Sequence, residues 1–201
     1  MMTPNSILAQ TRRGLQLVAG AGVLLVAASC SSILDVKNPN NIAEDALANP
    51  AAAGPEANGA LAALTRALGF STLVYADATD EMDWIGSRDS WNELDKGAIG
   101  NFANEFADDQ FKYTAEARYV ADQAIVRLEG FDKAGTLASR ADLMRSYIYG
   151  AVIYSSIADQ YDDFAFSNKT VPAAPVGRAN MGRLYDTAVD RKSTRLNSSH
   201  T

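Results

Sequence analysis

Two groups of acidic residues are the first candidates for chemistry in this sequence. The first group holds Asp77, Asp80, Glu81 and Asp83, and the second holds Asp159, Asp162 and Asp163. Two carboxylates at a suitable separation can hydrolyse glycosidic bonds, one as the acid and the other as nucleophile or base. Neither group has the alternating acidic residues, the Gly and the closing Glu of a calcium-binding loop. We therefore expect solvated charge at helix ends, with no metal site and no catalytic residue.

The only histidine, His200, lies in residues 190–201, which we call the tail. Residues 190–200, DRKSTRLNSSH, coincide one for one with the translation of a common short-read sequencing adapter. We therefore predict that the tail is not native and that the gene continues beyond Val189, which removes His-based catalysis and His metal sites from consideration. We also expect that removing the tail leaves stability unchanged, because a polar tail buries nothing.

A third candidate lies in the segment 83–101, which has no helical period and is rich in Gly, Ser, Asp and Asn. We predict a loop there. Trp84 and Trp91 lie in this loop with Arg88 between them. Indole rings stack on the apolar faces of sugars, and loops on a rigid scaffold are where binding residues concentrate. Trp84, Arg88 and Trp91 are therefore the candidate ligand-binding residues. Packing of the two indoles in a small core is the alternative.

The beginning of the chain has the pattern of a bacterial lipoprotein signal. The pair Arg12 and Arg13 precedes an apolar run over 15–28, and small residues lead to Cys30. This pattern predicts a signal peptide over 1–29 and lipid attachment at Cys30, with more than one acyl chain as the membrane anchor. Outside this run no stretch reaches ~18 uninterrupted apolar residues, so we expect no transmembrane helix after Cys30. Ser31 in place of Asp indicates the outer membrane, by resemblance to sorted bacterial lipoproteins.

The elements that must position these residues are helices. Apolar residues at helical spacing predict long helices over 55–68, 113–128 and 139–161, and a short one over 41–49 ends before Pro50. We expect Gly69 and Gly130 to end the first two long helices, and Ser139 to cap the third. A last amphipathic helix begins at 181–190 and carries Leu184, Tyr185 and Ala188. The fold class is therefore all-α.

The two strongest helices are joined by the short segment 128–139, which makes them antiparallel neighbours. In the second of them we expect an apolar side made of Met144, Tyr147, Ile148, Ala151, Val152 and Ile157. Tyr147, Tyr154 and Tyr161 recur every seven residues, which places them on one helical stripe. We interpret this stripe as core or helix contacts. Paired helices of this kind are similar to tetratricopeptide hairpins.

Composition and charge exclude several kinds of protein. The chain has 201 residues, 47% hydrophobic and 21% charged, which is ordinary for one globular domain. Without residues 1–29 and 190–201 it keeps 13 of its 18 basic and 23 of its 24 acidic residues, a formal charge of −10. Such an acidic surface argues against nucleic acid and anionic lipid headgroups as partners.

Several stretches between Cys30 and Val189 together resemble the SusD/RagB family of outer-membrane nutrient-uptake lipoproteins. They are LDVKNPNNIAEDAL, LVYADATDEMD, EARYVADQAIVRLEG, SRADLMRSYIYGAVIYSSIADQYDDF and MGRLYDTAV, and their order carries the resemblance. The resemblance implies a longer all-α protein with tetratricopeptide-like hairpins that covers a TonB-dependent transporter. It also implies binding of glycans or other nutrients. The carboxyl-terminal half of such proteins has no counterpart here.

Three functions are consistent with the sequence. The first is a glycan- or nutrient-capture lipoprotein whose partner is a TonB-dependent, SusC-like transporter. The second is a lipid-anchored helical-repeat scaffold of the cell envelope, and the third is a carboxylate-dependent glycoside hydrolase. We favour the first, which requires no cofactor and no catalysis. A transporter gene next to this one would separate it from the other two.

Overall fold

The computed structural model describes residues 44–98, 100–168 and 171–198. The signal over 1–29, Cys30 and Asn41 lie outside these residues. Every regular element of the described part is helical. The elements are η1 (Glu44–Ala48), η2 (Pro50–Ala52), α2 (Ala53–Ala78), α3 (Asp89–Asp95), α4 (Glu105–Lys133), α5 (Arg140–Gln160), η3 (Arg178–Asn180) and α6 (Arg183–Ser198). The predicted all-α class is confirmed for this part of the chain.

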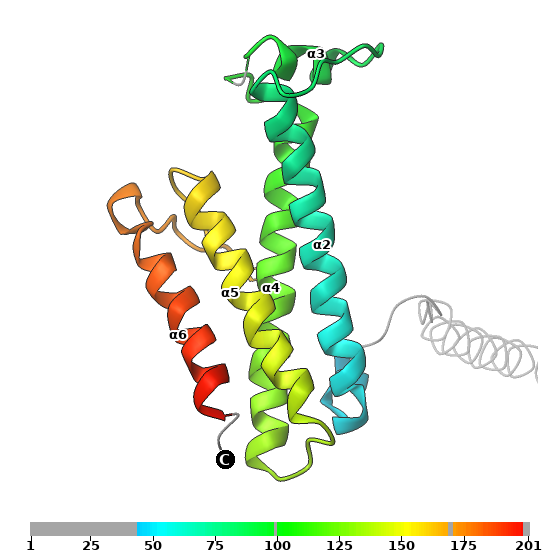
Figure 1. The fold of residues 1–201 in the computed structure, drawn as a ribbon, viewed down its shortest axis with the longest axis vertical. Helices are drawn as coiled ribbons and strands as arrows, with labels where there is room; N and C mark the ends of the chain where they lie inside the picture. The colour runs from blue at the N-terminus through cyan, green and yellow to red at the C-terminus, as the bar shows by residue number, and fades with distance from the viewer. Residues whose placement is uncertain (1–43, 99, 169–170, 199–201) are drawn as a thin grey trace, which may run out of the picture. The chain divides into compact units, whose positions relative to one another are not determined.

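The four long helices pack side by side with alternating directions (Figure 1). α2 contacts α4 and α5, and α5 also contacts α4 and α6. The antiparallel pairing predicted across the short α4–α5 connection is confirmed. α2 and α4 reach beyond the ends of α5 and α6, and α3 lies at that extended end (Figure 1). The α2–α4 hairpin therefore presents α3 and its flanking loops away from the other helices.

Small residues allow α2 and α4 to approach closely. Ala63 and Ala67 of α2 and Ala117 and Ala121 of α4 are all buried in the main apolar cluster. The same cluster continues to α5 and α6, whose large buried side chains fill the space beside the alanines. Interaxial distance depends on the side chains at the contact, so alanine faces permit a tight pair. Separate smaller clusters lie near the α4–α5 turn and at α3.

Several helix boundaries differ from those predicted from glycines and from loop-like composition. Gly69 does not end α2, which continues to Ala78, and Gly130 does not end α4, which continues to Lys133. A glycine inside a helix costs about 1 kcal/mol relative to alanine, and burial of the flanking face outweighs that cost. The turn that ends α4 uses Gly135, whose φ is +68°. The predicted loop over 83–101 contains α3. In the described part of the predicted helix over 41–49, the chain forms the short 3-10 turn η1.

Most of the predicted apolar side of α5 faces the core, with Tyr147 and Ile157 buried, but the prediction is wrong for Val152. Val152 is 38% exposed, whereas Leu143, Gly150 and Ile153 are buried although we did not predict them. Residues 147–154 of α5, YIYGAVIY, contain no charged residue, so their period alone does not select a face. Tyr147 and Tyr154 are buried as predicted. Ser139 occupies the N-cap position, but its side chain makes no capping hydrogen bond.

By length and composition, the 29 residues Pro50–Ala78 are apolar enough to cross a membrane. This differs from the expectation of no such segment after Cys30. In the structure α2 packs along α4 and α5, and it carries Glu56, Arg66 and Asp77. The core helix of a bundle passes the same test of length and composition. One side of α2 is buried against α4 and α5, and Leu61, Leu73 and Tyr75 of the same helix are exposed.

Gly69→Ala is expected to raise the free energy of unfolding by about 0.5–1 kcal/mol, because it restricts the unfolded chain. Gly69 is exposed in the middle of α2, and an added Cβ would meet no atom within 4 Å. Urea denaturation followed by circular dichroism measures the change. The control is Gly135→Ala, which is expected to lower stability because φ there is +68°. A loss of stability in the Gly69 variant would contradict this explanation.

Candidate functional site

The three predicted ligand-binding residues come together at the α3 end of the molecule. The rings of Trp84 and Trp91 stack with centroids 5.7 Å apart, and Trp91 stacks on Phe106 at 4.1 Å. The guanidinium of Arg88 lies 4.9 Å from the centre of the Phe106 ring. Phe70 of α2 completes the group through contacts with Trp91 and Phe106. We call Phe70, Trp84, Trp91 and Phe106 the aromatic cluster.

Asn104 fixes the geometry of the aromatic cluster. Its side-chain oxygen accepts hydrogen bonds from the backbone N–H groups of Phe106 and Ala107, at 3.0 and 3.3 Å, and so caps α4. Its side-chain nitrogen donates to the carbonyl of Ser90 at 2.8 Å, which ties α3 to the start of α4. Trp91 on α3 and Phe106 on α4 are thereby held in register. Sequence analysis missed Asn104, although an Asn before an amphipathic run is a capping signal.

Much of the indole surface in this cluster is used for packing. Trp91 stacks on two rings, and the Trp84 ring lies so close to Gly86 that a Cβ there would come within 2.3 Å of it. The backbone N–H of Trp84 donates to Asp95 at 3.0 Å. Arg88 is exposed and pairs with Glu105. The three residues form one structural unit, with Arg88 its most accessible member.

Two apolar side chains next to the aromatic cluster are almost completely exposed. Ile85, between α2 and α3, is 97% exposed, and Phe102, between α3 and α4, is 95% exposed. Met82 in the first of these loops is 45% exposed. Exposed apolar groups gathered on one end of a protein are typical of surfaces that contact another molecule. Sequence analysis did not single out these residues, which lie in segments without a helical period.

The second acidic group is occupied by contacts inside the protein. The Asp159 carboxylate accepts from the Tyr185 hydroxyl at 2.5 Å, and Asp162 pairs with Arg178 at 2.9 Å. Asp163 accepts from the backbone N–H of Gly177 at 2.8 Å. These carboxylates therefore organise the segment between α5 and α6. No group of three or more potential metal ligands occurs among the residues that the structure describes.

Asp77 stands apart from the other members of the first acidic group, which are exposed. It is 2% exposed near the end of α2, and its Oδ2 atom has no hydrogen-bond partner. Burial raises the pKa of Asp77 above the ordinary value of 3.8, and the nearby Asp95 raises the pKa further. The indole N–H of Trp84 is also buried without a partner. The Asp77 carboxyl group therefore destabilises the folded protein when it is ionised.

Asp77→Asn is expected to stabilise the protein at neutral pH. Because the pKa of folded Asp77 lies above 3.8, the folded state binds this proton more tightly than the unfolded state. The contribution of Asp77 to stability therefore falls as pH rises from 3.8 through the folded-state pKa, and then stays constant. Urea denaturation at acidic and neutral pH measures the difference between variant and wild type. An advantage of the variant that is as large below pH 3.8 as at neutrality would contradict this assignment.

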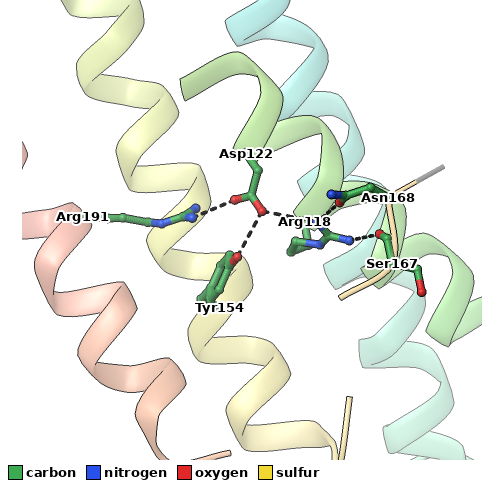
Figure 2. A network of polar contacts seen from close by, with 6 residues as sticks. All are labelled: Arg118, Asp122, Tyr154, Ser167, Asn168 and Arg191. Carbon is green, nitrogen blue, oxygen red and sulfur yellow. Dashed lines mark hydrogen bonds and ion pairs between the residues drawn. The ribbon is translucent and has the colours of Figure 1, made fainter. Parts of the chain in front are cut away.

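A buried arginine that sequence analysis did not single out joins α4 to the segment after α5 (Figure 2). Arg118 is 3% exposed. Its guanidinium donates to the Asn168 side chain at 2.9 Å and to the Ser167 carbonyl. It also lies 3.4 Å from Asp122, one turn further along α4. Arg118 therefore fixes the 164–168 segment against the helices.

Asp122 also connects α4 with α5 and α6 (Figure 2). Its Oδ2 accepts from the Tyr154 hydroxyl at 3.0 Å, and its Oδ1 pairs with Arg191 at 2.7 Å. Burial, together with the Asp122 charge, raises the pKa of Tyr154 to about 12, so the phenol remains a donor at neutral pH. The Arg191 side chain is only 18% exposed. The expectation that the tail buries nothing is therefore wrong for Arg191.

No protein-family model, curated protein or solved structure matches this chain.

Proposed function

We propose that this protein is an outer-membrane lipoprotein that captures glycans or other nutrients and delivers them to a TonB-dependent transporter. The observation that carries the proposal is the α3 end of the α2–α4 hairpin. The aromatic cluster there is flanked in sequence by the exposed side chains of Ile85, Phe102 and Arg88. The resemblance to SusD/RagB proteins supplies the ligand class, and we further propose that the helix pairs are tetratricopeptide-like hairpins.

The carboxylates of the second acidic group bind to other groups of the protein, which favours ligand binding over hydrolysis as the function. Each member of the second acidic group accepts a hydrogen bond or ion pair from its own protein. In the first group, Asp77 is buried, whereas Asp80, Glu81 and Asp83 are exposed. A hydrolase needs two carboxylates that face the substrate with different protonation states. The hydrolase alternative would gain support only from turnover of a glycan, which we do not expect.

The envelope-scaffold alternative differs in its partner. The exposed apolar residues at the α3 end suit a protein contact as well as a sugar contact. Co-purification with a TonB-dependent transporter from detergent-solubilised outer membranes supports nutrient capture. If the protein co-purifies only with other envelope proteins and binds no glycan, the scaffold function replaces the proposal.

The binding experiment uses the full chain and a panel of α- and β-linked glucose oligosaccharides, with isothermal titration calorimetry. Trp84→Ala with Trp91→Ala is expected to weaken glycan binding, but this variant also loses packing. Ile85→Ser with Phe102→Ser leaves the cluster intact and is expected to weaken binding about five-fold, as for one lost stacking contact of about 1 kcal/mol. The control is Val126→Ser, which changes an exposed residue of α4 outside the cluster.

Unchanged affinity in the Ile85/Phe102 and Trp84/Trp91 variants would reject the α3 end as the ligand site. The anchor is tested separately with Cys30→Ala. This variant is expected to lose all labelling by a radioactive fatty acid and to leave the membrane fraction, because the proposal places the acyl chains on Cys30. Labelling that persists in the Ala variant would reject Cys30 as the attachment site.

A further inference from the structure

The α3 end of the molecule carries a concentrated negative charge. Residues 80–105 hold seven acidic and two basic residues, a formal charge of −5, which is half of the −10 carried by residues 30–189. The acidic residues are Asp80, Glu81, Asp83, Asp89, Glu93, Asp95 and Glu105. They lie in α3, in the loop before it and at the first residue of α4, the part that projects beyond α5 and α6 (Figure 1). A ligand at this end therefore meets a negative field.

Little of this charge is neutralised by the protein itself. Arg88 pairs with Glu105, and the only other basic residue of the segment, Lys96, is exposed. Four exposed acidic residues form no ion pair with another described residue, and they are Asp80, Glu81, Asp83 and Asp89. These four carboxylates are therefore available to a cation from solution.

A buried carboxyl group at the same end also lacks a positive partner. Asp77 is 2% exposed, and its Oδ2 atom has no hydrogen-bond partner. Asp95 is close enough to raise the pKa of Asp77, and Asp95 Oδ1 accepts from the backbone N–H of Trp84 at 3.0 Å. A positive charge nearby favours the ionised form of a carboxyl group. A cationic ligand supplies the charge that the protein does not place there.

The apolar groups of the α3 end add contacts that a simple cation does not use. The rings of Trp84 and Trp91 stack on each other, and Ile85 and Phe102 are 97% and 95% exposed. Apolar groups of this kind pack on the apolar faces of sugar rings, and aromatic rings also attract cations. A sugar that carries ammonium groups makes both kinds of contact. A uronic acid or sulfated sugar is repelled by the carboxylates.

We propose that the ligands of the α3 end are cationic amino-sugar glycans, such as oligomers of glucosamine. This inference rests on the proposed function, and it names the class of glycan that the same site takes. The apolar side chains hold the sugar rings, and the exposed carboxylates pair with the ammonium groups. The same carboxylates exclude anionic glycans.

The test is isothermal titration calorimetry of the full chain with three β-linked pentasaccharides, of glucosamine, glucose and glucuronic acid. At about pH 6 amines are protonated and ordinary carboxyl groups are ionised. At low salt the glucosamine pentamer is expected to bind about ten-fold more tightly than the glucose pentamer, as two exposed ion pairs contribute. The glucuronic acid pentamer is expected not to bind. In about 1 M sodium chloride, where the Debye length is about 3 Å, the preference for glucosamine should disappear.

Two matched variants decide whether the preference comes from the α3 end. Asp83→Asn with Asp89→Asn is expected to weaken binding of the glucosamine pentamer about ten-fold and to leave binding of the glucose pentamer unchanged. Asp45→Asn with Asp186→Asn removes two exposed charges from η1 and α6 instead, and is expected to change neither affinity. Equal losses in the two double variants would show a general attraction to an acidic protein and overturn the proposal.

The ligand series separates this inference from the proposed function. Equal affinity for the glucose and glucosamine pentamers would overturn the inference and leave glycan capture standing. Binding of none of the three would reject glycan capture as well. Pentalysine carries ammonium groups without sugar rings and is expected to bind about ten-fold more weakly than the glucosamine pentamer. Pentalysine binding as tight as that of the glucosamine pentamer would assign this end to basic peptides and overturn the proposal.

Discussion

Arg118→Ala is expected to lower the free energy of unfolding by about 3–5 kcal/mol, the usual cost of removing one partner from a buried charged network. Arg118 is 3% exposed. Its removal leaves the Asn168 side chain and the Ser167 carbonyl without their donor, and it removes one of two cations from Asp122. The Phe166 ring, whose centre lies 5.4 Å from the guanidinium, also loses a contact. The loss comes from several unpaired groups at once.

Urea denaturation followed by circular dichroism at 222 nm measures this loss. The matched control is Arg178→Ala, which breaks the ion pair with Asp162 in the same connection between α5 and α6. Both side chains of that pair are largely exposed, at 79% and 77%. Exposed pairs contribute about 0–1 kcal/mol, so the control should change little. Equal effects of the two substitutions would show that Arg118 does not act as a buried anchor.

The contacts of Arg118 could not be predicted from the sequence. Arg118 stands within a predicted helix beside Ala117 and Tyr119, and its spacing says only which side of the helix it occupies. Its partners at 167 and 168 follow another helix and lie in a segment without a period. Neither helical spacing nor composition relates such positions. The buried network depends on how that segment folds back over α4, which is tertiary information.

Helix existence and the pairing of α4 with α5 could be predicted because they depend on local period and short connection length. The glycine signals failed at Gly69 and Gly130, where packing of the flanking residues outweighs a local preference of about 1 kcal/mol. Each of these glycines is exposed, so neither disturbs a contact face.

The candidate ligand residues also show the difference between what local sequence predicts and what depends on tertiary packing. Trp84, Arg88 and Trp91 are near one another in sequence, and the expectation that they act together agrees with their positions. The partners Phe70 and Phe106 belong to α2 and α4, and their contacts with Trp91 require the hairpin to form. Sequence analysis left ligand stacking and core packing as alternatives for the indoles. The structure shows extensive packing, and their contact with glycans remains a prediction.

Phe164→Ala is expected to lower the free energy of unfolding by about 3–5 kcal/mol, the range for large aromatic side chains removed from a core. Phe164 is 1% exposed, and its ring centre lies 5.0, 5.3 and 5.1 Å from those of Phe111, Tyr161 and Phe166. It joins the end of α5 to α4 at the point where the chain turns toward α6. Its removal leaves a cavity that these rings cannot close without moving.

The control for Phe164 is Phe102→Ala, because Phe102 is 95% exposed and its removal should change stability by no more than about 0.5 kcal/mol. A double variant with Arg118→Ala adds a sharper test. Phe166 contacts the Phe164 ring at 5.1 Å and the Arg118 guanidinium at 5.4 Å, so both substitutions loosen the same segment. The double variant is therefore expected to lose less stability than the two single losses added together, by about 0.5–3 kcal/mol. Strict additivity would mean that Phe164 and Arg118 hold this segment independently.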